Sequence, residues 1–405
     1  MMTYMIHGKK MVTVSKLGTI DHGAMIIDNG KIIAVGHWES MKEKFPTIDV
    51  IDCSESIITP ALIDCHTHLL EFAPSSLYPV TPETHFWAGR SILFHALSCG
   101  ITALGEQICG HPLCDFSIED YRNAVKQLPI DVSFAATSIS IGFEKLAHFT
   151  SVTQSKAVEQ KDLIDTTIVT KIAAASDYPG ENIFINATPA NFTEKEVPRA
   201  GEIIYSLDKL KQIVDIYHQF GKQIGCHVAG EEGIDLALKA GIDVLHHAHG
   251  ISADQLDIAA QQGVKIVATP MGGTHLAPNS PEEILRFVDK KIPVSISTDS
   301  YLPPYKGVSW LPFQDQTLKG PEVLMLIAHP SMHLLQHQGV EENEILALLT
   351  ANPATILGKN HVFGRLEPGL EANFLVAEGI PGLEITEIDH IKKVFYRGIK
   401  LIDRG

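Results

Sequence analysis

The hydrophobic pattern of the chain differs between its two ends and its middle. Short strand-like runs occupy both ends, near 24–28, 31–35, 373–377 and 394–401. Asn29-Gly30 separates the first two runs, and this dipeptide is typical of a two-residue β-hairpin turn. The pattern therefore predicts a small β-sandwich domain built from both termini, residues 1–57 and 360–405.

Between these ends, apolar β-rich segments alternate with helical periodicity. The segments lie near 57–66, 101–106, 131–137, 182–187, 222–227, 243–247, 264–270 and 293–299. Apolar residues recur every three or four positions from Ile203 to Tyr217, and Ser280–Glu283 is a capping box that opens another helix. Eight strand–helix units predict an α/β fold, a (β/α)₈ TIM-type barrel over residues 58–359. A doubly wound sheet would give the same local signals.

Composition narrows the class of protein. A length of 405 residues fits a barrel with a small appendage, and 45% hydrophobic residues suffice for a large core. The net charge of −16, without a Lys/Arg cluster, argues against nucleic acid or an anionic membrane as partner. The six cysteines form no CxxC pair, and the sequence shows neither a secretion signal nor a long apolar span. We expect a cytoplasmic protein that acts on a small molecule; the composition is compatible with a homo-oligomer.

Histidines and one aspartate follow several of the predicted strands. His66 and His68 come directly after the first apolar run, and residues i and i+2 of a strand point the same way. Because functional residues of a barrel sit at the carboxyl ends of its strands, His227, His247 and Asp299 belong to the same site. Imidazole nitrogens and carboxylate oxygens are the ligands that zinc prefers. The sequence therefore predicts a cation site.

Other polar residues are weaker candidates. Glu106 ends the second strand, and Glu231 and Glu232 follow His227 in a glycine-flanked loop. Acidic residues at a helix N-terminus explain the Glu231-Glu232 pair equally well. His275 is a candidate for substrate contact. The third and fourth strands offer no obvious ligand, and the chain has no phosphate loop, dinucleotide fingerprint or nucleophile elbow.

Together these motifs resemble the amidohydrolase superfamily of metal-dependent hydrolases over nearly the whole chain. The similar stretches are Asp64–His68, Gly225–His227, Asp243–His247, Ser297–Asp299, Thr350–Ala354 and Gly364–Gly369. Members with two metals usually carry a bridging lysine on the fourth strand, where this sequence has Phe184. The resemblance therefore implies a one-metal member, similar to imidazolonepropionase and the cytosine and guanine deaminases. Deaminases place a glutamate three residues after the fifth-strand histidine, but Gly230 stands there, so a cyclic-amide hydrolase is comparably supported.

The resemblance also implies roles for these residues. His66, His68, His227 and Asp299 would hold one divalent ion, zinc in the first place and iron as the alternative. Asp299, His247 and Glu231 would act in catalysis, and Glu106, Glu232 and His275 would bind the substrate. The expected reaction is hydrolysis of a C–N bond in a cyclic amide or an aminated heterocycle. The alternatives are a two-metal, peptidase-like amidohydrolase, which Phe184 disfavours, and a non-catalytic protein of this fold.

Overall fold

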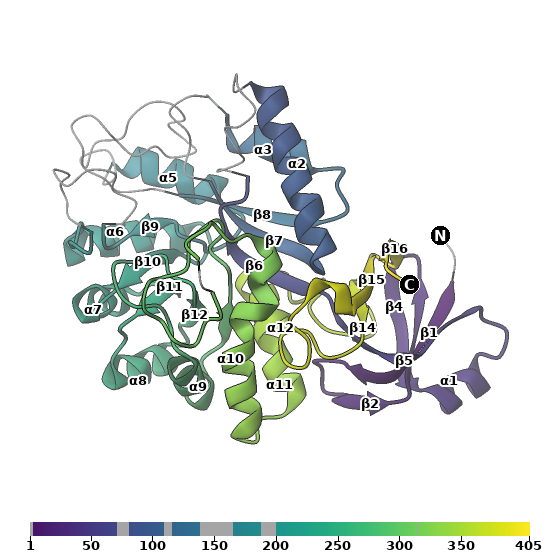
Figure 1. Ribbon diagram of the computed structural model, residues 1–405. Coiled ribbons are helices and arrows are strands. Elements are labelled where there is room, and N and C mark those ends of the chain that lie inside the picture. The colour runs from purple at the N-terminus through teal and green to yellow at the C-terminus, as the bar shows by residue number, and fades with distance from the viewer. Residues whose placement is uncertain (1–2, 71–80, 109–115, 138–164, 188–199, 314) are drawn as a thin grey trace.

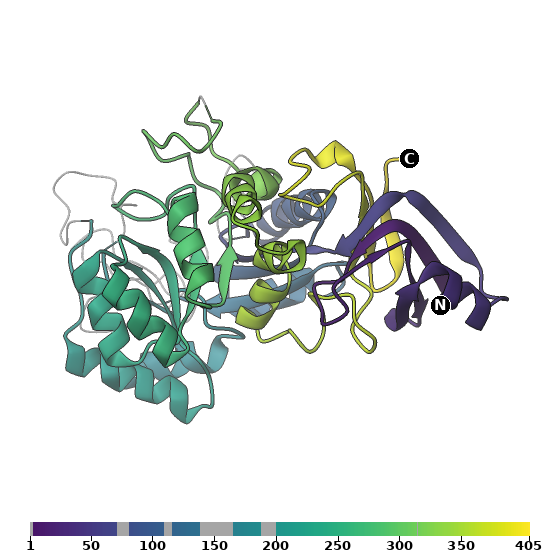
Figure 2. The same cartoon turned by 90° about the horizontal axis from the view of Figure 1, so that it is seen from below.

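The computed structural model describes residues 3–70, 81–108, 116–137, 165–187, 200–313 and 315–405. It contains a barrel of parallel strands and a smaller mixed sheet that carries both termini (Figures 1 and 2). Both features confirm the fold class predicted from the sequence. Within the described part of the chain, no helix is long and apolar enough to cross a membrane.

Eight parallel strands form the barrel in two arcs. One arc is β6 (Leu62–Thr67), β7 (Ile101–Ile108) and β8 (Asp131–Ala136). The other is β9 (Ile183–Phe184), β10 (Gly225–Ala229), β11 (Val244–His249), β12 (Lys265–Ala268) and β13 (Val294–Ile296). A parallel bridge between Thr67 and Ser300 closes one join, and the Asp177 amide donates to the Phe134 carbonyl at the other.

Helices surround the strands (Figure 1). They are α2 (Pro82–Ser98), α3 (Ile118–Val125), α5 (Thr166–Ala175), α6 (Leu207–Gln219), α7 (Glu231–Ala240), α8 (Ala253–Gln262), α9 (Pro281–Asp289), α10 (Leu324–His337), α11 (Glu342–Leu346) and α12 (Ala351–Ile356). Short 3₁₀ turns occur at Pro321–Val323, Ala347–Leu349 and Ile388–His390. The predicted capping box is present, since the Ser280 hydroxyl accepts from the Glu283 amide and Pro281 opens α9.

The small sheet takes its strands from both ends of the chain. They are β1 (Tyr4–Val12), β2 (Thr19–Asp21), β3 (Gly23–Asp28), β4 (Lys31–His37), β5 (Val50–Pro60), β14 (Phe374–Ala377), β15 (Ile391–Tyr396) and β16 (Ile399–Asp403). Their order is β16-β15-β14-β5-β1-β3-β4, with β2 beside β1 and the short helix α1 (Trp38–Lys44) after β4. The predicted hairpin turn is confirmed, because Asn29 and Gly30 both have positive φ, 48° and 80°. The exact domain boundaries stay a prediction.

Two predicted strands are divided in the structure. The apolar run at 57–66 is shared between β5, which pairs with β14 of the small sheet, and β6 of the barrel. The stretch 394–401 holds parts of β15 and β16, because Arg397 and Gly398 turn the chain with φ of 49° and 70°. Of the cysteines, Cys53, Cys65, Cys99 and Cys226 are buried and unpaired, and Cys109 and Cys114 lie outside the described residues.

Candidate metal centre

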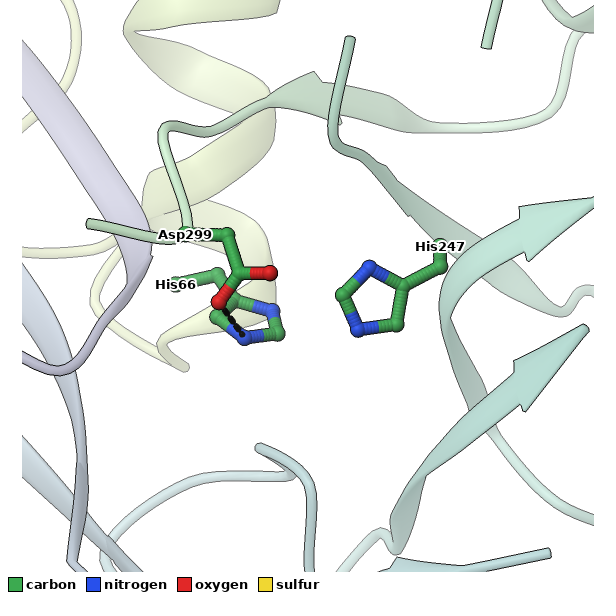
Figure 3. A group of neighbouring side chains, drawn as sticks. All are labelled: His66, His247 and Asp299. Carbon is green, nitrogen blue, oxygen red and sulfur yellow. Dashed lines mark ion pairs between the residues drawn. The ribbon is translucent and has the colours of Figure 1, made fainter. Parts of the chain in front are cut away.

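The predicted ligands meet at the carboxyl ends of the barrel strands. His66 lies in β6, His247 lies in β11, and Asp299 follows β13. Figure 3 shows their side chains turned toward one common space. His66 and His247 are 0% and 1% exposed, and Asp299 is 5% exposed, so the site is largely shielded from bulk water.

The first group of ligand atoms surrounds one point. Asp299 Oδ1 lies 3.2 Å from His66 Nε2 and 3.5 Å from His68 Nε2. Oε2 of a residue absent from the predicted set, Glu181, lies 3.7 Å from each of these two nitrogens. Ligand atoms bonded to a tetrahedral zinc ion lie about 3.3–3.6 Å apart. The four measured separations, 3.2–3.7 Å, are therefore close to those between ligand atoms of a zinc ion.

The second group lies on the other side of the same carboxylate. Oε1 of Glu181 lies 2.8 Å from His227 Nδ1 and 2.7 Å from His247 Nε2. His227 and His247 therefore share Oε1, while His247 also groups with His66 and Asp299, since ligand atoms of those three residues lie within 4.8 Å of one another. The predicted ligand set of His66, His68, His227 and Asp299 stays a prediction. Oε2 of Glu181 thus faces His66 and His68, and Oε1 faces His227 and His247, within one cluster of histidines and carboxylates.

A hydrogen-bond chain fixes which nitrogen of His66 carries its proton. His246 Nε2 lies 3.0 Å from the Pro179 carbonyl, which can only accept, so this nitrogen carries the proton of His246. Burial lowers the pKa of His246 to about 3, so its ring is neutral and Nδ1 is an acceptor. His66 Nδ1 lies 2.7 Å from that acceptor and donates to it. Nε2 of His66 is left with a lone pair directed toward Asp299 and Glu181.

Thr269 fixes which nitrogen of His247 carries its proton. Its hydroxyl donates to the Gly272 carbonyl over 2.7 Å and accepts from His247 Nδ1, also over 2.7 Å. Burial lowers the pKa of His247 to about 4, so the ring is neutral and its Nε2 lone pair faces the Glu181 carboxylate. The 2.7 Å between His247 Nε2 and Glu181 Oε1 is a hydrogen-bond distance, shorter than the separation of two ligands on one zinc ion, so these two atoms would move apart to share an ion.

The carboxylates are tuned by the same surroundings. Burial raises the pKa of Asp299 to about 6, although the neighbouring histidines oppose this. Burial alone would raise the pKa of Glu181 too, but His66 and His227 outweigh it and hold the pKa well below its ordinary value. The buried Nε2 of His66 has no hydrogen-bond partner among the described residues. Neutral imidazoles, ionised carboxylates and an unsatisfied nitrogen suit a divalent metal ion.

The backbone around the centre is constrained. His247, Ala248 and Asp299 have positive φ values of 71°, 49° and 53°. Such conformations cost non-glycine residues about 1–3 kcal/mol and cluster at functional sites. A Cβ on Gly273, where φ is 110°, would lie 2.3 Å from Asp299 Oδ2 and 2.5 Å from the His247 ring. The loop after β12 therefore passes directly against the metal centre at a position that only glycine fits.

The other candidates from the sequence lie around this centre. Glu106 is buried, and its two oxygens accept from the Thr67 hydroxyl and the Leu70 amide, each over 2.6 Å. Glu231 and Glu232 are exposed on the first turn of α7, where carboxylates favour the helix dipole. Their predicted catalytic and substrate-binding roles stay predictions.

His275 lies in the loop that passes against the centre. Its Nδ1 is buried and has no hydrogen-bond partner within the described ranges, and a Cβ on Gly201 would lie 2.6 Å from its Nε2. Burial lowers the pKa of His275, and the nearby His227 adds to this effect. The predicted contact between His275 and the substrate also stays a prediction.

The sequence analysis found no obvious ligand on the fourth strand, and β9 itself supplies none in the structure. Phe184 of β9 stacks on the His227 ring with centroids 4.5 Å apart. Glu181, just before β9, supplies the carboxylate instead. The surrounding Pro179-Gly180-Glu181-Asn182 reads as an ordinary turn, so the sequence offered no signal for it beyond an acidic residue close to a strand.

A parallel-strand barrel with histidines and carboxylates at the strand ends defines a metal-dependent hydrolase of the amidohydrolase fold. The family model described as "Amidohydrolase family" matches residues 57–399, and the chain belongs to this family. Among curated relatives, imidazolonepropionase of Bacillus velezensis is 22% identical over 402 residues, covering 93% of this chain and 89% of the relative.

Solved structures show the same fold at low identity. A prolidase solved with N-methylphosphonate-L-proline has a TM-score of 0.72 at 15% identity and covers 99% of this chain and 100% of its own. Ochratoxinase of A. niger has a TM-score of 0.73 at 16% identity and covers 100% of this chain and 96% of its own. The chain is therefore a metal-dependent amidohydrolase whose substrate these similarities leave undetermined.

Proposed function

We propose that this amidohydrolase binds two divalent metal ions bridged by Glu181 and hydrolyses a linear amide. The observation that carries the proposal is the position of the Glu181 carboxylate, with Oε2 facing His66 and His68 and Oε1 facing His227 and His247. A carboxylate that presents one oxygen to each of two histidine pairs is suited to bridge two cations.

Different residues would hold the metal ions and transfer the proton. His66, His68 and Asp299 would hold one ion, His227 and His247 the other, and Glu181 both. Bound divalent ions lower the pKa of a water molecule and polarise a carbonyl oxygen. Asp299 would take the proton of the attacking water and deliver it to the leaving nitrogen. Burial of the site keeps competing water away and strengthens these electrostatic effects.

The proposed substrate class depends on Glu181, which offers a bridging carboxylate where the sequence had suggested none. A peptidase-like reaction was disfavoured only because Phe184 stands where a bridging residue was expected. Glu181 removes that objection, and the fold is shared with a prolidase and an ochratoxinase. An amide between an acyl group and an amino acid is therefore the first substrate class. A cyclic amide is the second, supported by the similarity to imidazolonepropionase across both chains.

Elemental analysis of the purified protein tests the metal assignment. We expect about two zinc or other divalent ions per chain. Glu181→Gln should lose at least one of them, because an amide is a poorer bridging ligand than a carboxylate. Glu232→Gln, a change to an exposed carboxylate on α7, should leave the metal content unchanged. One ion per chain that Glu181→Gln retains would overturn the bridged site and restore the one-metal interpretation.

Mass spectrometry of the products distinguishes the substrate classes. A linear amide gives two fragments, a cyclic amide gives one ring-opened product heavier by one water, and an aminated heterocycle releases ammonia. The panel contains N-acyl amino acids, dipeptides ending in proline, five-membered cyclic amides and aminopyrimidines. Ring opening alone, with two metals present, would move the assignment to cyclic amides.

A further inference from the structure

Helix α10 carries histidines at four-residue intervals, far along the chain from most ligands of the metal centre. They are His329, His333 and His337. Residues four apart on a helix lie on the same face. The ring centroids of His329 and His333 are 5.5 Å apart, and those of His333 and His337 are 4.4 Å apart with planes at 84°. The three imidazoles therefore form a ladder along α10, which is labelled in Figure 1.

The last two members of this ladder are available to a ligand. His333 and His337 are exposed, and neither has a hydrogen bond or ion pair with another residue in the described ranges. His329 is half-buried and donates from Nδ1 to the Gly382 carbonyl over 3.0 Å. His329 is thus tied to the neighbouring loop, whereas His333 and His337 can turn a nitrogen toward a shared point.

We propose that His333 and His337 form a binding site for a divalent transition-metal ion on the surface of α10, separate from the metal centre. An ion about 2.0–2.1 Å from a ring nitrogen lies about 3.2 Å from the ring centroid. Two rings at a right angle around the ion then have centroids about 4.5 Å apart, and two rings at a tetrahedral angle about 5.2 Å. The observed 4.4 Å belongs to an edge-to-face contact, and it is short enough for side-chain rotation to bring one nitrogen of each ring to a shared ion at the right angle that Ni²⁺ and Cu²⁺ prefer.

The helix holds the pair in place before any ion arrives. Its opposite face is buried, through Ile327, Met332 and Leu335 among others. Binding therefore orders only the two exposed side chains, because the backbone that carries them is already fixed. Water molecules would complete the coordination, since the site offers only two protein ligands.

Titration calorimetry with Ni²⁺ tests the proposal on full-length protein without a histidine tag, after its metal centre has been filled with zinc. The wild type should bind about one further Ni²⁺ per chain. His337→Ala should weaken this binding about tenfold or more, because one nitrogen ligand is lost. His361→Ala removes an exposed histidine outside any helix and should change nothing.

A register variant separates a chelating pair from general attraction to histidines. His337→Gln combined with Gln338→His keeps the number of histidines but turns one imidazole about 100° around the helix axis. Ni²⁺ binding should fall as it does in His337→Ala, with the circular dichroism spectrum unchanged. Tight binding by the register variant, or no Ni²⁺ binding by the wild type, would overturn the proposal. Neither outcome depends on hydrolytic activity or on the number of ions in the metal centre.

Discussion

Replacement of His246 should weaken metal binding while leaving the barrel folded. His246 is fully buried in β11 and contacts no ion directly in the proposed site. Its Nε2 is held by the Pro179 carbonyl at 3.0 Å, and its Nδ1 accepts from His66 Nδ1 at 2.7 Å. His246 thereby keeps the Nε2 lone pair of His66 directed at the metal position.

The magnitude follows from these two hydrogen bonds. His246→Ala leaves His66 Nδ1 and the Pro179 carbonyl buried without these partners, and each such group costs about 1–3 kcal/mol. The loss of His66 orientation should lower zinc affinity about 10- to 100-fold, which corresponds to about 1.4–2.7 kcal/mol of binding free energy. His246→Asn retains an acceptor near the position of Nδ1 while losing the contact with Pro179. It should therefore keep most of the zinc affinity.

Zinc affinity is measured by competition with a chromophoric chelator, and the melting temperature of each metal-free variant is measured separately. If His246 acts by positioning His66, the alanine variant should bind zinc more weakly than the asparagine variant, even when the two metal-free proteins are equally stable. Equal affinities in the two variants and the wild type would refute the reasoning. A loss of affinity that merely follows the loss of stability would show that His246 acts by packing alone.

Three further outcomes are expected. Asp299→Asn should lower kcat about 10²–10⁴-fold, because the amide cannot take the proton of water, while the circular dichroism spectrum stays unchanged. Near-normal turnover would exclude Asp299 as the general base. Zinc affinity should fall as the pH drops through about 6, because Asp299 binds a proton there in the metal-free fold and this proton competes with the ion. Chelator competition between pH 5 and 8 measures this dependence, and a flat profile would show that Asp299 is not a ligand. Gly273→Ala should impair zinc binding and activity, because the new Cβ would lie 2.3 Å from Asp299 Oδ2. Gly263→Ala controls for backbone strain alone, because Gly263 also has a positive φ, 70°, but no atom lies near its Cβ position. Equal effects of the two substitutions would refute the steric argument.

Much of the fold could be predicted because local signals agree with it. The Asn29-Gly30 turn and the Ser280–Glu283 capping box are short-range features, and both are present in the structure. The division of the apolar run at 57–66 between two sheets was harder to predict, because both halves are hydrophobic. In the structure β5 pairs with β14 and β6 pairs with β7. A sequence records how apolar a segment is, whereas the sheet it joins depends on its partner strands.

The predicted site was most complete where a ligand follows a recognisable strand. His66, His227 and His247 lie near the ends of their strands, Asp299 follows β13, and the structure brings all four together. How these side chains are arranged around Glu181 could not be deduced from the sequence, because the arrangement depends on the three-dimensional position of that residue. A strand-end pattern therefore predicts which residues converge, but it does not predict which of them share an ion.

Glu181 escaped prediction because distant contacts, rather than a strand, bring it to the centre. Gln107 of β7 accepts from the Glu181 amide over 2.9 Å and donates to the Tyr178 hydroxyl over 2.5 Å. A Cβ on Gly180 would lie 2.4 Å from the Gln107 side-chain oxygen, so the turn fits against β7 only with glycine there. Gln107 lies more than 70 residues earlier in the chain, and nothing in its local sequence marks it as the support for a metal-binding carboxylate. The position of the Glu181 carboxylate thus depends on the packing of this turn against β7, and substitutions at Gln107 or Gly180 should disturb the centre as substitutions at Glu181 do.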